Sequence, residues 1–171
     1  MAATLSVRVQ TGAAAGAESA AQTGIDLASI DNATNTLANR QANPVTVGGS
    51  TVYSFEKYLK LKIDVIPANG VTNFKMWSAQ GGAAGAGTGL TINALGATVA
   101  YTQPVQTVSS LAVAALPTTQ GAGLVWDTAS YSALNAVTKY TILQLAVGTT
   151  AVAGNMAQVT LNYSTTKPKY E

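Results

Sequence analysis

The sequence predicts an all-β protein, namely an antiparallel β-sandwich or jelly-roll-like barrel with an extended N-terminal arm. Several short runs alternate apolar and polar residues with the period of two that is typical of strands. Gly, Pro and Asn clusters separate these runs, and no helical period is sustained, because Gly12, Gly16 and Gly24 interrupt the alanine-rich stretch. Seven or more such strands favour a sandwich or a barrel and leave the choice between these topologies open.

The clearest strand lies between residues 53 and 65. From residue 59 to residue 65, branched apolar side chains at odd positions alternate with charged ones at even positions. A first strand is predicted over residues 5–10, and the Gly48-Gly49 pair before the clearest strand indicates a hairpin. The turn Pro67–Gly70 leads into another alternating run, residues 71–78, which we expect to be the antiparallel neighbour of the clearest strand.

The second half of the chain continues in the same way. Strands are expected over residues 90–100 with a break at Gly96, in an extended pair at 101–105 and 108–113, and over 140–147 and 157–164. The glycine-rich residues 81–89 are predicted to form a loop at one end of a sheet. The expected organisation is an arm over residues 1–44, a sandwich body over 45–164 and a solvated tail over 165–171.

The amino-acid composition limits the classes of function that this chain can have. The 171 residues contain no His and no Cys, which excludes Ser-His-Asp and Cys-His catalysis and the usual zinc and copper sites. Nine basic and seven acidic residues give a net charge of +2, and a weakly charged surface favours association. Lys57, Lys60 and Lys62 are interpreted as a solvated strand face, so no nucleic-acid partner is expected. No apolar run suggests a membrane span, and no export signal precedes the first strand, so synthesis in a cytoplasm and no membrane partner are expected.

Carboxylate chemistry needs separate examination, because a glycosidase requires only two carboxylates. Glu56 and Asp64 would lie roughly 26 Å apart on one straight strand, which is too far to act on one bond. Asp127 could face either of them across a cleft, but no motif indicates it. Asp26 and Asp31 offer oxygen ligands of the kind calcium prefers, without matching a calcium-loop pattern. No catalytic residue, cofactor or metal site is therefore predicted.

Apolar residues of the N-terminal region and the two tryptophans are candidate contact residues. Trp77 shares its strand parity with Lys75 and not with Phe74 or Met76, so it is expected on a second sheet face or in a subunit contact. The alternative is a carbohydrate-binding platform formed by Trp77, Trp126 or Tyr101. The predicted interface residues are Leu5, Val7, Val9, Ile25, Leu27, Ile30, Leu37, Trp77 and Trp126.

Six segments of the sequence carry a resemblance: Tyr53–Lys62, Thr72–Trp77, Tyr101–Val105, Tyr140–Gly148, Thr149–Gly154 and Asn162–Ser164. Taken in order, they resemble the head decoration (cement) proteins of tailed bacteriophages. The resemblance implies a β-sandwich present in many copies on the capsid surface of a virion, with the major capsid protein and other copies of itself as partners. It also implies trimers, an arm that reaches over neighbouring subunits, and no catalysis or cofactor. The hypothesis that follows is that Met1–Asn43 contributes these contacts. Alternatives are a tail, neck or fibre-base structural protein and a carbohydrate-binding module.

Overall fold

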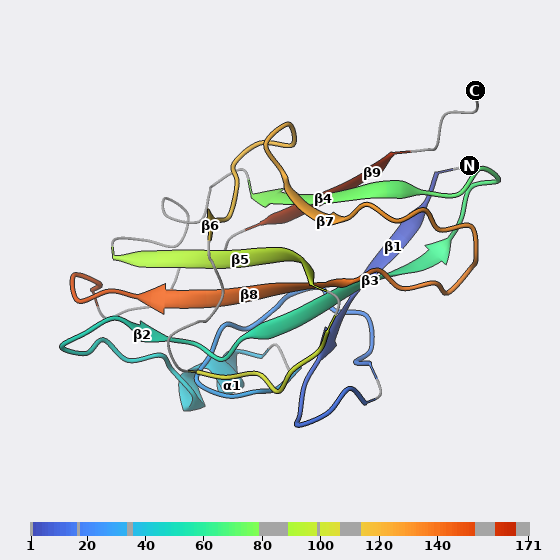
Figure 1. Cartoon of the computed structure of the whole chain (residues 1–171). Helices are drawn as coiled ribbons and strands as arrows, with labels where there is room; N and C mark the ends of the chain where they lie inside the picture. Colours follow the sequence, from blue (N-terminus) through green and yellow to red (C-terminus); the bar gives the residue numbers. More distant parts are fainter. Residues whose placement is uncertain are drawn as a thin grey trace.

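The computed structural model describes residues 2–16, 18–33, 36–78, 89–98, 100–106, 114–152 and 160–166. Two antiparallel sheets pack face to face, which confirms the predicted all-β sandwich (Figure 1). In spatial order, the larger sheet contains β1 (Thr4–Gln10), β3 (Lys57–Val65), β8 (Tyr140–Val147), β5 (Leu90–Thr98) and β6 (Ala114–Ala115), with β2 (Val52–Tyr53) also pairing with β8. The smaller sheet contains β7 (Leu124–Asp127), β4 (Thr72–Ser78) and β9 (Leu161–Thr166).

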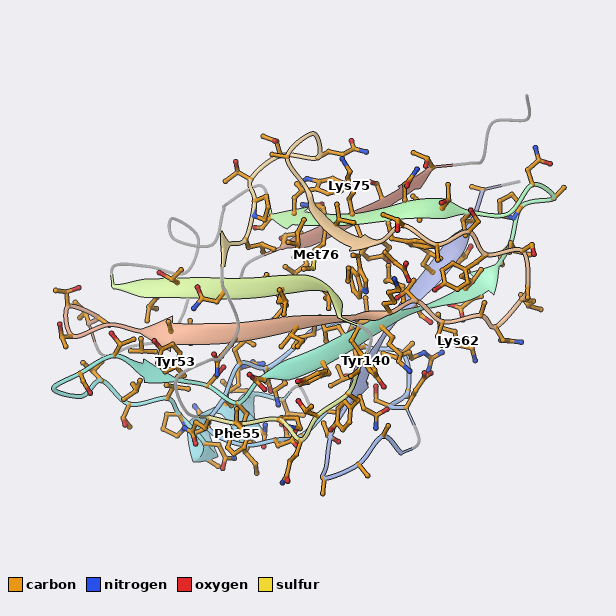
Figure 2. All side chains as sticks on the ribbon, in the orientation of Figure 1. Tyr53, Phe55, Lys62, Lys75, Met76 and Tyr140 are labelled. Carbon is orange, nitrogen blue, oxygen red and sulfur yellow. The ribbon has the colours of Figure 1, made fainter. Side chains whose placement is uncertain are left out.

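The main core lies between the sheets and follows the predicted alternation. Leu59, Leu61 and Ile63 of β3 are fully buried together with Phe74 and Met76 of β4. Figure 2 shows the same alternation on β4, where Met76 points between the sheets and Lys75 points to the outer side. The strict period of two in these strands therefore places their apolar faces on one core.

The prediction that residues 71–78 neighbour the clearest strand within one sheet is wrong. β3 and β4 belong to different sheets, and the turn Pro67–Gly70 carries the chain from one to the other. The Gly70 N–H donates to the Pro67 carbonyl, and Gly70 has a φ of +72, a conformation that glycine adopts without strain. A turn of this kind lets the apolar faces of both strands meet across the core.

The Gly48-Gly49 hairpin prediction is also wrong. Residues 45–51 form no strand, and the following β2 is only two residues long. β2 pairs with the end of β8, whose beginning pairs with β3, so β2 and β3 lie along the same edge of β8 with residues 54–56 between them. The run from Val52 to Val65 thus behaves as one interrupted strand.

The N-terminal region is mostly extended and lies along the sandwich. β1 pairs with β3 along its whole length. The Ser19 and Gln22 N–H groups donate to β1 carbonyls on its other edge. Beyond them, Ile25 and Leu27 pack against the main core. The short helix α1 (Leu37–Ala42) follows and, with the segments beside it, lies near β2, away from the smaller sheet (Figure 1). β1, Ile25 and Leu27 therefore contribute to the core of the body.

The two sheets approach each other differently at their two sides. At the β5/β7 side, a Cβ built on Gly96 would lie 1.9 Å from the Val125 carbonyl oxygen, so the backbones nearly touch. At the β1/β9 side, a hollow of about 310 Å³ separates the strands, lined by residues 3–5 and 163–165. We call these the closed side and the open side of the sandwich.

Candidate functional site

Lys57 is the most unusual charged residue in the described part of the chain. It is only 1% exposed, and its Nζ donates to the Ile30 carbonyl at 3.0 Å and to the Asn32 carbonyl at 2.7 Å. The Phe55 N–H also donates to the Ala28 carbonyl at 3.0 Å. These bonds fasten residues 28–32, which we call the strap, to the start of β3.

The carboxylates around the strap balance two cations. Asp26 is buried, and its Oδ1 accepts a hydrogen bond from Arg40 of α1 at 2.8 Å. Asp31 accepts from the Gly12 N–H at 2.8 Å. Three buried oxygens, Asp26 Oδ2, Asp31 Oδ1 and Asn32 Oδ1, have no partner among the described residues. Lys57 and Arg40 supply positive charge beside the two carboxylates.

The chemistry of Lys57 yields a pH prediction. Burial lowers the pKa of its ammonium group to about 8, although Asp31 and Asp26 attract the charge and oppose the shift. Between pH 8 and the ordinary lysine pKa of about 10.4, the unfolded chain binds this proton and the folded chain does not, so the contribution of Lys57 to stability rises with pH. We expect the free energy of unfolding of the wild type to rise relative to that of Lys57→Met from pH 8 to pH 10, measured by urea denaturation. Parallel pH profiles would contradict the assignment.

Sequence reasoning missed Lys57 because it was grouped with Lys60 and Lys62. Those two lysines lie on the other face of β3, where Lys60 contacts Glu18 at 3.5 Å and the Tyr140 ring at 4.4 Å from its centroid. The odd parity of Lys57, shared with Leu59 and Leu61, is the signal that distinguishes it.

Glu56, directly before Lys57, holds a second covering segment. It is 2% exposed, its N–H donates to the Val105 carbonyl at 3.1 Å, and its carboxylate accepts from the Val105 N–H at 3.4 Å. Burial raises the pKa of Glu56, partly offset by that N–H. Gln144 of β8 also donates to the Val105 carbonyl at 3.5 Å. Residues 101–106 are therefore held in irregular conformation and do not form the strand that was predicted there; residues 107–113 lie outside the described residues.

Three tyrosines support this segment on the outer face of the larger sheet. Tyr58, Tyr101 and Tyr140 form edge-on and tilted ring contacts with centroids 4.9 to 5.7 Å apart. The Tyr101 hydroxyl donates to the Gly12 carbonyl at 2.7 Å, and the Tyr58 hydroxyl lies 2.6 Å from Thr102 Oγ1. Figure 2 shows Tyr140 on the opposite side of the larger sheet from Met76. Both faces of β8, the central strand, are therefore largely buried.

The predicted interface residues divide between core and surface. Leu5, Val7, Ile25 and Leu27 are partly buried and pack against the main core, and Val9 is buried in it. Ile30 is half-buried in the strap and accepts the Lys57 bond. Only Leu37, which is 55% exposed, and the half-buried Trp77 present side chains outward.

The structure corrects the prediction that Trp126 is a contact residue. Its indole is 1% exposed and lies in the main core, and its N–H donates to the Lys139 carbonyl at 3.0 Å. It is therefore a core residue of this chain, with no surface to offer to a partner or a sugar. Its parity could not be assigned from the sequence because β7 is only four residues long.

Each described carboxylate is engaged by its own chain. Asp64 lies 3.9 Å from Arg8, and Asp127 accepts three hydrogen bonds. Glu171 lies outside the described residues. No group of three or more metal-ligating side chains occurs among the residues that the structure describes.

The helix α1 forms the first exposed surface of interest. None of its residues is buried, although six residues are too few for a helix that is stable in isolation. Thr36 caps it by accepting from the Asn39 N–H at 3.2 Å, and Arg40 is bound to Asp26. The Asn32 side chain donates to Asn39 at 2.9 Å. A polar network thus holds in place a helix that has no buried residue in the single chain.

The outer face of the smaller sheet forms the second exposed surface. Residues 73–75, 120–121, 125, 128, 164 and 166 line an open groove of about 580 Å³. Lys75 is its charged residue, with hydroxyl and amide side chains around it and the 41% exposed Val125 opposite. Trp77 lies on the same face, two residues further along β4 and opposite Asn162 of β9.

Comparisons with known proteins find no relative of this chain. No family model matches the chain, and neither a curated protein nor a solved structure does. Among the described residues, no helix has the length and apolar character needed to cross a membrane.

Proposed function

We propose that this chain is a virion structural protein of the head-decoration type, which binds the outer surface of a phage head in many copies and stabilises it through protein–protein contacts. The observation that carries the proposal is that α1 is exposed and yet held in a fixed position. A helix with no buried residue contributes little to its own fold by packing, yet Thr36, Asp26 and the asparagine side chains fix its position. Such a helix is pre-organised for a contact outside the chain.

Two further features support the proposal. The charged fraction of 9% leaves a surface of neutral polar groups, which approaches a protein shell with little charge to desolvate. The segments that resemble decoration proteins include most of β3 and β4 and the whole of β8, which together form a large part of the sandwich. We place the shell contact on the exposed residues around α1 and not on Val9 or Leu27, which serve the core.

A substitution at Leu37 tests this proposal. Purified chain is added to particles that lack it, and bound copies are counted by quantitative mass spectrometry. We expect many copies per particle, and we expect Leu37→Glu to lower the affinity about tenfold, because a charge replaces an apolar contact. Leu134→Glu is the matched control, since Leu134 is 57% exposed and lies between β7 and β8.

The outcomes separate the alternatives. A few copies per particle would indicate a tail or neck position, and no binding would overturn the virion proposal. Equal losses for Leu37→Glu and Leu134→Glu would remove α1 from the contact.

Carbohydrate binding is the second candidate function, favoured by the half-buried Trp77 beside polar side chains on the outer face of the smaller sheet. Selective binding on a glycan array that is lost in Trp77→Ala, with particle binding unchanged, would support it over the first.

A further inference from the structure

Within the part of the chain that the structure describes, the open side of the sandwich exposes the outer edge of β9. Among the described residues, β9 pairs with β4 along one edge only, so alternate N–H and C=O groups on its other edge point away from the sheet. By contrast, the β7 edge faces β5 across the closed side, where Gly96 leaves no room for a side chain. The second half of the β1 edge is covered by residues Ser19 and Gln22.

The sequence of β9 lacks the features that protect natural edge strands. Edges are usually blunted by charged side chains, by proline or by a covering segment. The six residues Leu161–Thr166 contain no charge and no proline, and they include tyrosine and threonines with high strand propensity. Neutral strands of this kind readily accept a further strand.

Tyr163 marks the contact point. It lies in the middle of β9 and is 40% exposed, and its ring borders the hollow of about 310 Å³ between β9 and β1. Its hydroxyl donates to the Leu5 carbonyl at 3.4 Å, a long bond that a better acceptor can replace. A partly exposed tyrosine beside a hollow is the type of residue that dominates binding energies at interfaces.

We propose that β9 is a self-association edge, at which a second copy of this chain adds its own β9 in antiparallel orientation across a twofold axis. The two smaller sheets then form one continuous sheet of six strands, three from each copy. Charge favours a second copy as the occupant. Because β9 is uncharged, a twofold axis that sets the strand against itself opposes no like charges within the paired segment.

This assembly differs from the trimer that the resemblance to decoration proteins implies, and it does not depend on the virion proposal. Twofold pairing gives even numbers of chains, and it is measured on the purified chain without particles. Its failure and the failure of particle binding are therefore separate results.

The experiment measures mass against concentration by native mass spectrometry and light scattering. We expect the wild type to form a two-chain species that dissociates on dilution, and Tyr163→Lys to be monomeric at every concentration, because a lysine at an edge blocks pairing. Val125→Lys is the matched control, since Val125 is 41% exposed on the same sheet but belongs to β7 at the closed side. This control is expected to keep the two-chain species.

Amide hydrogen exchange provides a readout that does not depend on a variant. Exchange within residues 161–166 of the wild type is expected to slow as concentration rises, while exchange in β8 stays constant. A wild type that is monomeric at all concentrations, a trimer, or a two-chain species that survives Tyr163→Lys would each overturn the proposal.

Discussion

Replacing Asp127 by asparagine is expected to destabilise the protein by about 3 kcal/mol, because a fully buried carboxylate that accepts three hydrogen bonds is lost. Its Oδ1 accepts from the Ala129 N–H at 2.9 Å, and its Oδ2 accepts from the Tyr131 hydroxyl and the Lys139 N–H, both at 2.8 Å. An asparagine has one acceptor oxygen, and its amide group would face at least one of these donors.

Acid is expected to reduce the stability that Asp127 contributes. Burial alone would raise the pKa of Asp127, but the bonds from Lys139, Ala129 and Tyr131 outweigh it, so the pKa lies below its usual value. Asp127 therefore contributes stability above pH 3.8, its ordinary pKa, and this contribution is lost as the pH falls through the lowered folded value. Urea denaturation at pH 7 and at lower pH should show a smaller acid loss in Asp127→Asn than in the wild type.

Two variants calibrate this result. Tyr131→Phe removes one of the three donors and is expected to cost about 1 kcal/mol. Asp64→Asn changes a partly exposed carboxylate that lies 3.9 Å from Arg8, and it is expected to change the free energy of unfolding by less than about 0.5 kcal/mol. If Asp127→Asn were as mild as Asp64→Asn, the three-bond assignment would be wrong.

Replacing Gly96 by alanine is expected to destabilise the protein by about 3 kcal/mol, because the new methyl group would collide with backbone and not with a side chain that can move. The nearest atom would be the Val125 carbonyl oxygen, and the Val125 carbonyl carbon would lie 2.9 Å away. To relieve this contact, β5 and β7 must separate, which opens the core at the closed side. Thermal and urea unfolding measure the loss.

The matched control is another glycine. Gly121, in the loop before β7, would meet nothing within 4 Å if it carried a Cβ, so Gly121→Ala is expected to be neutral within about 0.5 kcal/mol. If Gly96→Ala were as mild as Gly121→Ala, the two sheets would be able to separate without a loss of stability.

The parts of the fold that the sequence predicts are those encoded by side-chain alternation. Residues 59–65 and 140–147 form the strands expected of them, and β5 does contain an irregularity at Gly96 and Ala97, where Ala97 has a φ of 57. Alternation specifies which face of a strand is buried, and on β3 and β4 it identified the inner face correctly.

The parts that could not be predicted depend on contacts between distant residues. Alternation does not say which strand pairs with which, so the crossing of the chain at Gly70 was mistaken for a hairpin within one sheet. The short helix α1 escaped notice because its stability comes from Asp26 and Asn32 and not from its own six residues. The buried position of Lys57 likewise depends on carbonyl groups more than twenty residues earlier in the chain.

The central place of β8 has a consequence for synthesis. β8 lies between β3 and β5, yet it follows them in the chain by about eighty and fifty residues respectively. While the ribosome is still producing residues 99–139, these earlier strands have no central partner, and each exposes an apolar face. Folding is slow because the long loops between these strands must close, at a cost in entropy, before strand pairing stabilises the chain. The nascent chain must therefore remain soluble until residues 140–147 emerge, when β8 joins the two earlier strands into one sheet.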